Sequence, residues 1–257
     1  MSSSGHLALL PRVLGWDYAN LPGATRKSFE VALHAGSAPI LAAVALRAGR
    51  RGGEAADPIA LALTLLPPVA AGFALERSIE IRLGGMRSVG MAQIAAGAAL
   101  LLADRRPHQR DRTDAGDYLA VGLGQAIALV PGVSRTGAAL TAARLRGLSR
   151  PASLRLALTA AVPVTLGAVA LKGFRAARAA GAGERVGSAP PGTHNHLLAP
   201  AVAGAGAALA AAAAASPLVE RLERPRSYAP LAAYRIGFGA LALAAARRGV
   251  WAPAESA

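Results

Sequence analysis

Apolar residues fill seven long windows of this chain, and charged residues collect between them. The windows with the least charge are residues 31–46, 58–75, 88–103, 118–133, 156–171, 197–219 and 228–246. A helix needs about 20 mostly apolar residues to cross a bilayer, and each window approaches that length when a few tolerable residues are added at its ends. The pattern predicts an all-α, polytopic membrane helical bundle that forms a single domain over residues 1–257.

One window is followed closely by a shorter apolar stretch, residues 137–148, with Pro131 and Gly132 between the two. Proline lacks the N–H that a helix interior needs, and glycine lets the backbone turn sharply. We therefore expect a spanning helix that ends at Pro131, a break, and a second helix that begins near Thr136. A break at membrane depth is stable only where it is buried in protein or lines a watery cavity.

The composition is typical of a membrane protein and argues against disulfides and against a zinc site. The 257 residues are 53% hydrophobic and only 16% charged, whereas a soluble domain usually has about 25% charged residues. Because there is no cysteine, disulfides and Cys-ligated metals are excluded. The five His residues show no His-x-x-x-His spacing, so we do not expect a zinc enzyme.

Charge is strongly positive, with a formal net charge of +14. The basic residues lie mainly in the loops, of which residues 172–196 are predicted to be the longest. We interpret them as interfacial residues that meet anionic lipid headgroups. Nucleic-acid binding would require a basic face on a soluble fold, so we do not expect a nucleic-acid partner.

The segment Pro131–Gly137 combines several phosphate-binding features. Ser134 and Thr136 offer hydroxyl groups, and Arg135 offers a planar fork of N–H donors. A helix that starts here would also direct free N–H groups and its positive dipole end at the same point. The alternative is an arginine that reaches the headgroups beside a structural turn. The convergence of glycine, hydroxyls and a helix start favours a phosphate cradle.

The chain opens with the polar run Ser2–His6, a hydroxyl cluster beside a histidine. In phosphoryl transfer a serine can attack phosphorus while a histidine moves protons. The run Ser2–Gly5 matches Ser134–Gly137 in its hydroxyl and glycine positions, and an apolar stretch follows each. This match predicts two repeated halves, residues 1–103 and 116–246, with broken helices that meet. A disordered chain start is the alternative.

Taken in order, these motifs resemble the signature of bacterial undecaprenyl-diphosphatases of the bacitracin-resistance type. The motif Pro-Gly-x-Ser-Arg-[Ser/Thr]-Gly is specific, and the resemblance covers essentially the whole chain. The residues that carry it are Ser2–Leu7, Phe29–Val31 with Gly36-Ser37, Gly124-Gln125, Ala128–Gly137, Gly147–Arg150 and Tyr234-Arg235.

This resemblance implies an activity, a fold and a location. The activity is hydrolysis of undecaprenyl pyrophosphate to the monophosphate, which recycles the lipid carrier of cell-wall precursors and confers bacitracin tolerance. The fold consists of two interlocked inverted repeats with re-entrant, broken helices. The protein would be a multi-pass protein of the bacterial plasma membrane, with the lipid pyrophosphate and the bilayer as its partners. A homodimer is left open.

The resemblance also implies roles for individual residues. By motif match, Ser3 is the candidate nucleophile, His6 the proton-transfer residue and Arg135 the pyrophosphate clamp. The substrate-binding residues expected around them are Ser4, Gln125, Gly132, Ser134, Thr136 and Gly137. A divalent cation, magnesium or calcium, is expected to assist, although the sequence assigns no ligands to it.

The sequence departs from the family pattern at its start. In the family, a helix with a Glu-x-x-x-Glu run precedes the first serine motif, and Met1 stands where that run should just have ended. Glu76 and Glu80 have the same spacing, but Arg77 and Arg82 surround them, so we interpret these glutamates as interfacial. We expect the reading frame to extend upstream of Met1.

Two further functions stay open at this point. Inverted repeats and broken helices are also typical of transporters, so a transporter or flippase of the lipid carrier is the first alternative. The second is an inactive truncated homologue that only binds the lipid, suggested by the acidic run that is not found ahead of Ser2–His6.

Overall fold

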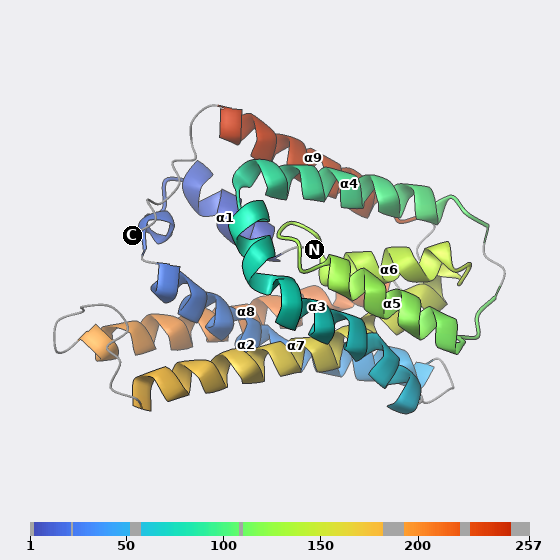
Figure 1. Cartoon of the computed structure of the whole chain (residues 1–257), viewed down its shortest axis with the longest axis horizontal. Helices are drawn as coiled ribbons and strands as arrows, with labels where there is room; N and C mark the ends of the chain where they lie inside the picture. The colour runs from blue at the N-terminus through green and yellow to red at the C-terminus, as the bar shows by residue number, and fades with distance from the viewer. Residues whose placement is uncertain are drawn as a thin grey trace.

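The computed structural model of the chain is helical (Figure 1). It describes residues 3–21, 23–51, 58–107, 110–181, 193–221 and 227–247. Its elements are α1 (Ser3–Val13), η1 (Asp17–Asn20), α2 (Gly23–Arg51), α3 (Pro58–Leu83), α4 (Met86–Asp104), α5 (Ala115–Ile127), α6 (Arg135–Leu145), α7 (Arg150–Gly181), α8 (Thr193–Arg221) and α9 (Ala229–Arg247). Within the described residues an isolated bridge between Arg110 and Leu148 is the only β pairing. The predicted all-α class is confirmed.

Five of the described helices contain stretches that are long and apolar enough to cross a membrane. These stretches are Phe29–Arg50, Met86–Asp104, Arg150–Leu171, Ala199–Val219 and Ala229–Arg247. Helix α3 adds a sixth when its two parts, Ile59–Leu75 and Arg77–Leu83, are counted as one span bent by 63°. Phe73 of α3 is 96% exposed, as expected for a side chain in contact with lipid tails. The chain is a multi-pass membrane protein.

The prediction of a spanning helix over residues 118–133 is wrong. Helix α5 has 13 residues and ends at Ile127, four residues before Pro131. Its length of about 20 Å is well short of the roughly 30 Å of a hydrocarbon core. The apolar composition continues through the turn into α6, which is why hydropathy alone overestimates the helix. The second helix begins at Arg135, one residue before the predicted start.

Helices α5 and α6 instead form a hairpin. They lie side by side (Figure 1), and a Cβ on Gly124 would come within 2.8 Å of the Ala138 carbonyl oxygen. Helix α5 also packs on α3, and α6 packs on α4 and α7. Protein therefore covers part of the hairpin, although Leu119, Leu123 and Ile127 of α5 stay exposed. Gly132 and Ser134 at the break are buried, as required of a helix break at membrane depth.

The loop predicted over residues 172–196 is also partly wrong. Helix α7 continues to Gly181, and α8 begins at Thr193. Residues 182–192 lie outside the described residues. Arg175 and Arg178 interrupt the apolar window but are compatible with helix, because arginine is a good helix former.

The helices repeat in the same order along the chain. Helices α1 and α6 each have 11 residues, α2 and α7 have 29 and 32, α3 and α8 have 26 and 29, and α4 and α9 each have 19. The predicted match of Ser2–Gly5 with Ser134–Gly137 aligns the starts of α1 and α6. The exact boundaries of the two halves stay a prediction.

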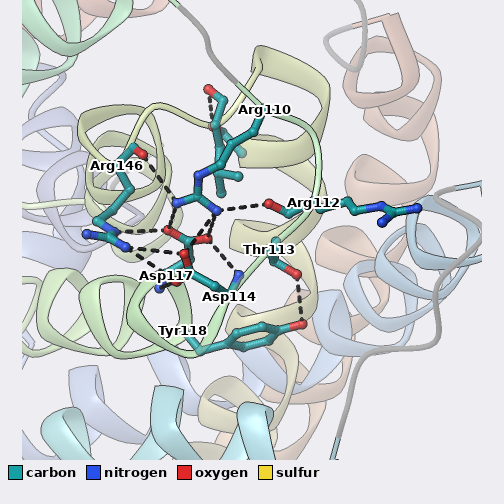
Figure 2. A network of polar contacts seen from close by, with 9 residues as sticks. Arg110, Arg112, Thr113, Asp114, Asp117, Tyr118 and Arg146 are labelled. Atoms are coloured by element: carbon teal, nitrogen blue, oxygen red, sulfur yellow. Dashed lines mark hydrogen bonds and ion pairs between the residues drawn. The ribbon is translucent and has the colours of Figure 1, made fainter.

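An ion-pair network holds the open end of the hairpin, where α5 begins and α6 ends (Figure 2). Asp117 of α5 is fully buried. It accepts two hydrogen bonds from Arg110, of 2.6 and 2.7 Å, and one of 3.0 Å from Arg146. Asp114 and Asp117 also form a capping box at the start of α5. Burial raises the pKa of Asp117, but the hydrogen bonds from Arg110, Asp114 N–H and Arg146 outweigh burial and leave the pKa below its usual value.

A second network ties this end to the spanning helices. Asp104, at the end of α4, accepts hydrogen bonds from Arg150 Nε at 2.6 Å, Ser227 Oγ at 2.9 Å and the Tyr228 N–H at 2.8 Å. The buried Arg144 side chain donates to the carbonyl oxygens of Arg106 and Leu148. These contacts join α4, α6, α7 and the start of α9, so they hold the open end of the hairpin against the spanning helices.

Candidate functional site

The turn of the hairpin requires glycine at its centre. Gly132 has a φ of 98°, which L side chains rarely adopt. A Cβ at this position would also lie 2.6 Å from the Val89 carbonyl oxygen of α4. The turn is therefore pressed against α4, and the sharp bend predicted at Gly132 is confirmed.

The first turn of α6 is capped by Ser134. Its buried hydroxyl oxygen accepts a 3.2 Å hydrogen bond from the Gly137 N–H, and its carbonyl oxygen accepts one of 2.8 Å from the Ala138 N–H. The N–H groups of Arg135 and Thr136 have no intrahelical acceptor, because the first residues of a helix lack one. These two N–H groups and the helix dipole favour an anion at this point.

Arg135 begins α6 and is partly buried. Its Nη1 donates a 3.4 Å hydrogen bond to Thr165 Oγ1 of α7, a neutral group. The residues that the structure describes place no carboxylate within ion-pair distance of Arg135. Within this described part of the chain its positive charge is not neutralised, which suits an anion-binding arginine.

A second arginine lies over the same turn. Arg235 of α9 is only 3% exposed, and its Nη2 donates to the Gly132 carbonyl oxygen at 3.3 Å. A Cβ at Gly137 would come within 2.5 Å of Arg235 Nη1, so the guanidinium lies directly against the first turn of α6. Neither a partner for its Nε nor a carboxylate near it is found among the described residues.

Arg235 was missing from the predicted site although it contributes to the family resemblance. The sequence did indicate Arg235, because this arginine lies in the middle of the apolar window 228–246. An ionisable residue inside a membrane segment is by default a functional candidate. The same rule had already selected Arg135.

The predicted N-terminal segment contacts α9, the helix that carries Arg235. His6 of α1 hydrogen-bonds Tyr234, the residue before Arg235, and its ring stacks on Phe238 at 4.3 Å. Leu9 is fully buried in the same cluster. Ser3 begins α1, but the side chains of Ser3 and Ser4 and the whole of Ser2 lie outside the described residues. Helix α9 thus contacts both predicted motifs through adjacent residues.

Gln125 belongs to α5, and its side chain contacts α3. Its side chain is 1% exposed, and Nε2 donates to the Thr64 carbonyl oxygen at 3.4 Å. This hydrogen bond connects two helices of the scaffold. The binding roles assigned to Gln125, Thr136 and the other site residues stay predictions.

The expected divalent cation would need a group of oxygen or nitrogen ligands. Over the described ranges, no group of three or more His, Asp or Glu side chains comes together in a way that could hold a metal ion. The described side chains thus do not provide a metal site of their own.

Comparison with known proteins gives a consistent assignment. The model of the family described as Bacitracin resistance protein BacA matches residues 1–241. An undecaprenyl-diphosphatase of Geobacter sulfurreducens is 32% identical over 263 residues, covering 95% of this chain and 91% of the relative. Undecaprenyl-diphosphatase 1 of Rhodospirillum rubrum is 33% identical over 268 residues, covering 97% and 90%.

A third relative, an undecaprenyl-diphosphatase of Desulforudis audaxviator, is 37% identical over 184 residues, which cover 65% of this chain and 67% of the relative. The family model covers most of the chain, and the relatives are all named undecaprenyl-diphosphatases. The chain therefore belongs to the Bacitracin resistance protein BacA family.

Proposed function

We propose that this protein is a membrane phosphatase that hydrolyses undecaprenyl pyrophosphate to undecaprenyl phosphate and inorganic phosphate. One observation carries the assignment: Arg135, at the start of α6, and Arg235, which contacts the Gly132 turn, have only neutral hydrogen-bond partners among the described residues. Burying a cation without a counter-charge is costly. A diphosphate bound at the turn would supply the missing negative charge.

The proposed chemistry is cleavage of the phosphoanhydride bond. An oxygen nucleophile attacks the terminal phosphorus, the bond to the bridging oxygen breaks, and the lipid monophosphate leaves. Arg135, Arg235 and the free N–H groups of α6 stabilise the charge that develops on the phosphate oxygens. Their fixed positions minimise reorganisation during the reaction.

We propose Ser3 as the nucleophile and His6 as the residue that moves its proton, on the strength of the motif match. In a second step, water attacks the phosphoserine, the serine hydroxyl is restored and phosphate is released. His6 hydrogen-bonds Tyr234 of α9, so its motif contacts the helix that also carries Arg235.

A transporter or flippase is not favoured, because the similar proteins reported above are all named as diphosphatases. We propose the bacterial plasma membrane as the location, since a polyprenyl carrier of cell-wall precursors is used there. A divalent cation that accompanies the diphosphate, and a homodimer, stay predictions.

Phosphate release from the reconstituted full chain tests this function. We expect vesicles that contain the protein and undecaprenyl pyrophosphate to release phosphate, and Arg135→Gln to abolish most of the release. Arg87→Gln, which changes an exposed arginine on α4, is the matched control and should keep wild-type activity. Transfer of the lipid between leaflets without phosphate release would support the transporter, and binding without either activity would support the inactive homologue.

A further inference from the structure

A local twofold relation connects α4 and α9, which lie side by side in Figure 1. A Cβ on Gly97 would lie 2.9 Å from Ile236 Cγ1, 3.0 Å from the Ala232 carbonyl oxygen and 3.2 Å from Arg235 Cβ. A Cβ on Gly239 would meet the matching atoms of α4.

These matching distances are 2.7 Å to Ile94 Cγ1, 2.6 Å to the Gly90 carbonyl oxygen and 3.0 Å to Gln93 Cβ. The residues correspond at one constant offset: 90 with 232, 93 with 235, 94 with 236, and 97 with 239. Gln93 therefore occupies on α4 the place that Arg235 occupies on α9.

The environment of Gln93 is that of a binding residue. Its side chain is 1% exposed, and within the described part of the chain its Oε1 has no hydrogen-bond partner. A buried polar atom without a partner costs free energy and calls for an explanation such as a ligand. The Gln93 amide is neutral, so it can satisfy a phosphate oxygen without adding another buried charge.

The position of Gln93 on α4 directs it toward the site. Val89, one helical turn earlier, is the residue against which the Gly132 turn packs. Residues four apart lie on one face of a helix, so Gln93 is on the α4 face that meets both the turn and α9. Arg235 reaches the Gly132 carbonyl oxygen from the opposite helix.

We propose that Gln93 is a substrate-binding residue that donates a hydrogen bond from its side-chain amide to the diphosphate. The amide can turn about its last bond, so either terminal atom can face the ligand. Gln93 and Arg235 then form a pair, one from each half of the chain, on either side of the diphosphate. The proposal rests on the diphosphate-binding site proposed above.

Kinetics of Gln93→Met test this pair, because methionine keeps the length of the side chain and removes the amide. We expect KM for the lipid diphosphate to rise about tenfold with kcat nearly unchanged, since a hydrogen bond to a charged group is lost in both the ground and transition states. The concentration of inorganic pyrophosphate that halves activity should rise in parallel. Gln93→Glu should lower kcat/KM by about a hundredfold, because it adds a like charge.

Met91→Leu on the exposed side of α4 is the control and should change neither constant. A folded Gln93→Met protein with wild-type KM and wild-type pyrophosphate inhibition would overturn the assignment. Thermal stabilisation by inorganic pyrophosphate gives a second measurement that needs no turnover, and it should be weaker in Gln93→Met and in Gln93→Asn. A wild-type chain that is inactive but is stabilised by pyrophosphate more strongly than Gln93→Met would overturn the phosphatase function and support the Gln93 assignment.

Discussion

The two ends of the α5–α6 hairpin both contain buried or half-buried arginines, but their partners differ. At the open end, Arg110 and Arg146 form ion pairs with Asp114 and Asp117 (Figure 2). Arg150 forms one with Asp104. At the turn, Arg135 and Arg235 hydrogen-bond only a threonine hydroxyl and a backbone carbonyl among the described groups. The charge at the open end is paired with carboxylates, whereas the described residues supply no carboxylate to the charge at the turn.

This difference separates scaffold from site in a chain rich in arginine. A carboxylate that accepts two or three strong hydrogen bonds fixes the backbone and leaves little charge for a ligand. An arginine with neutral partners lowers stability but binds an anion strongly, because the site excludes water. Substitutions at the turn should therefore reduce activity, whereas those at the open end should reduce stability.

The largest effect is expected for Arg135→Gln. Loss of the planar guanidinium should lower kcat/KM by about a thousandfold, or about 4 kcal/mol, as for a key charge-stabilising donor. Arg135→Lys should retain part of the activity, because it keeps the charge without the bidentate geometry. Phosphate release in detergent measures both variants, and a Gln variant with activity within threefold of wild type would remove Arg135 from the site.

A smaller loss is expected for Arg235→Gln, about a hundredfold in kcat/KM. Arg235 also holds the Gly132 carbonyl oxygen, so part of the loss reflects a less ordered turn. Removing a buried cation that has no carboxylate partner should leave the melting temperature equal or higher. The contrasting variant is Arg144→Gln at the open end, for which the melting temperature should fall. Equal losses of stability in both variants would contradict the comparison.

At the open end, Asp117→Asn should lower the stability of the protein. The variant leaves Arg110 and Arg146 without their shared carboxylate and should lower the free energy of unfolding by about 2 kcal/mol, which allows for the partial exposure of both arginines. Chemical denaturation measures this change. Activity per folded molecule should stay near the wild-type value, and a large loss of kcat in folded protein would show that the anchor takes part in the reaction.

The lowered pKa of the Asp117 carboxylate predicts that the protein loses stability in acid. The pKa of Asp117 lies below its usual value, so the stabilisation is fully present above the ordinary aspartate pKa of about 4 and is lost as pH falls through the lowered pKa. The melting temperatures of the wild type and Asp117→Asn should therefore differ at pH 7 and converge in acid. A constant difference between pH 7 and pH 3 would argue against this linkage.

Much of the fold followed from the sequence, and the failures have a common cause. Hydropathy located most of the spanning segments, because a bilayer imposes a length on apolar helices. Pro131 and Gly132 indicated the break. It could not distinguish the short helix α5 from a span, because the Ala128–Val130 turn is as apolar as the helix before it. Only packing against α3 and α6 decides where that helix ends.

The part of the site that is formed by consecutive residues could be predicted from the sequence. The motif Pro131–Gly137 contains its own turn, cap and helix start, so its geometry could be inferred from its residues. Arg235 and Gln93 are far from it in sequence and lie on apolar helices. Their connection with the site depends on the crossing of α4 and α9, where Gly90, Gly97 and Gly239 permit close contact.

The smallest effect is expected at Ser134, which lies at the turn but is already used by the protein. Its hydroxyl caps α6, so Ser134→Ala should cost about 1 kcal/mol of stability and only a few-fold in activity. Ser134→Asn and Ser134→Asp should both restore the cap, because each side chain accepts the Gly137 N–H. The aspartate also places a negative charge beside Arg135 and Arg235, so it should abolish diphosphate binding while the asparagine keeps it. Equal activity of the two capped variants would show that the arginines at the turn do not bind the anion.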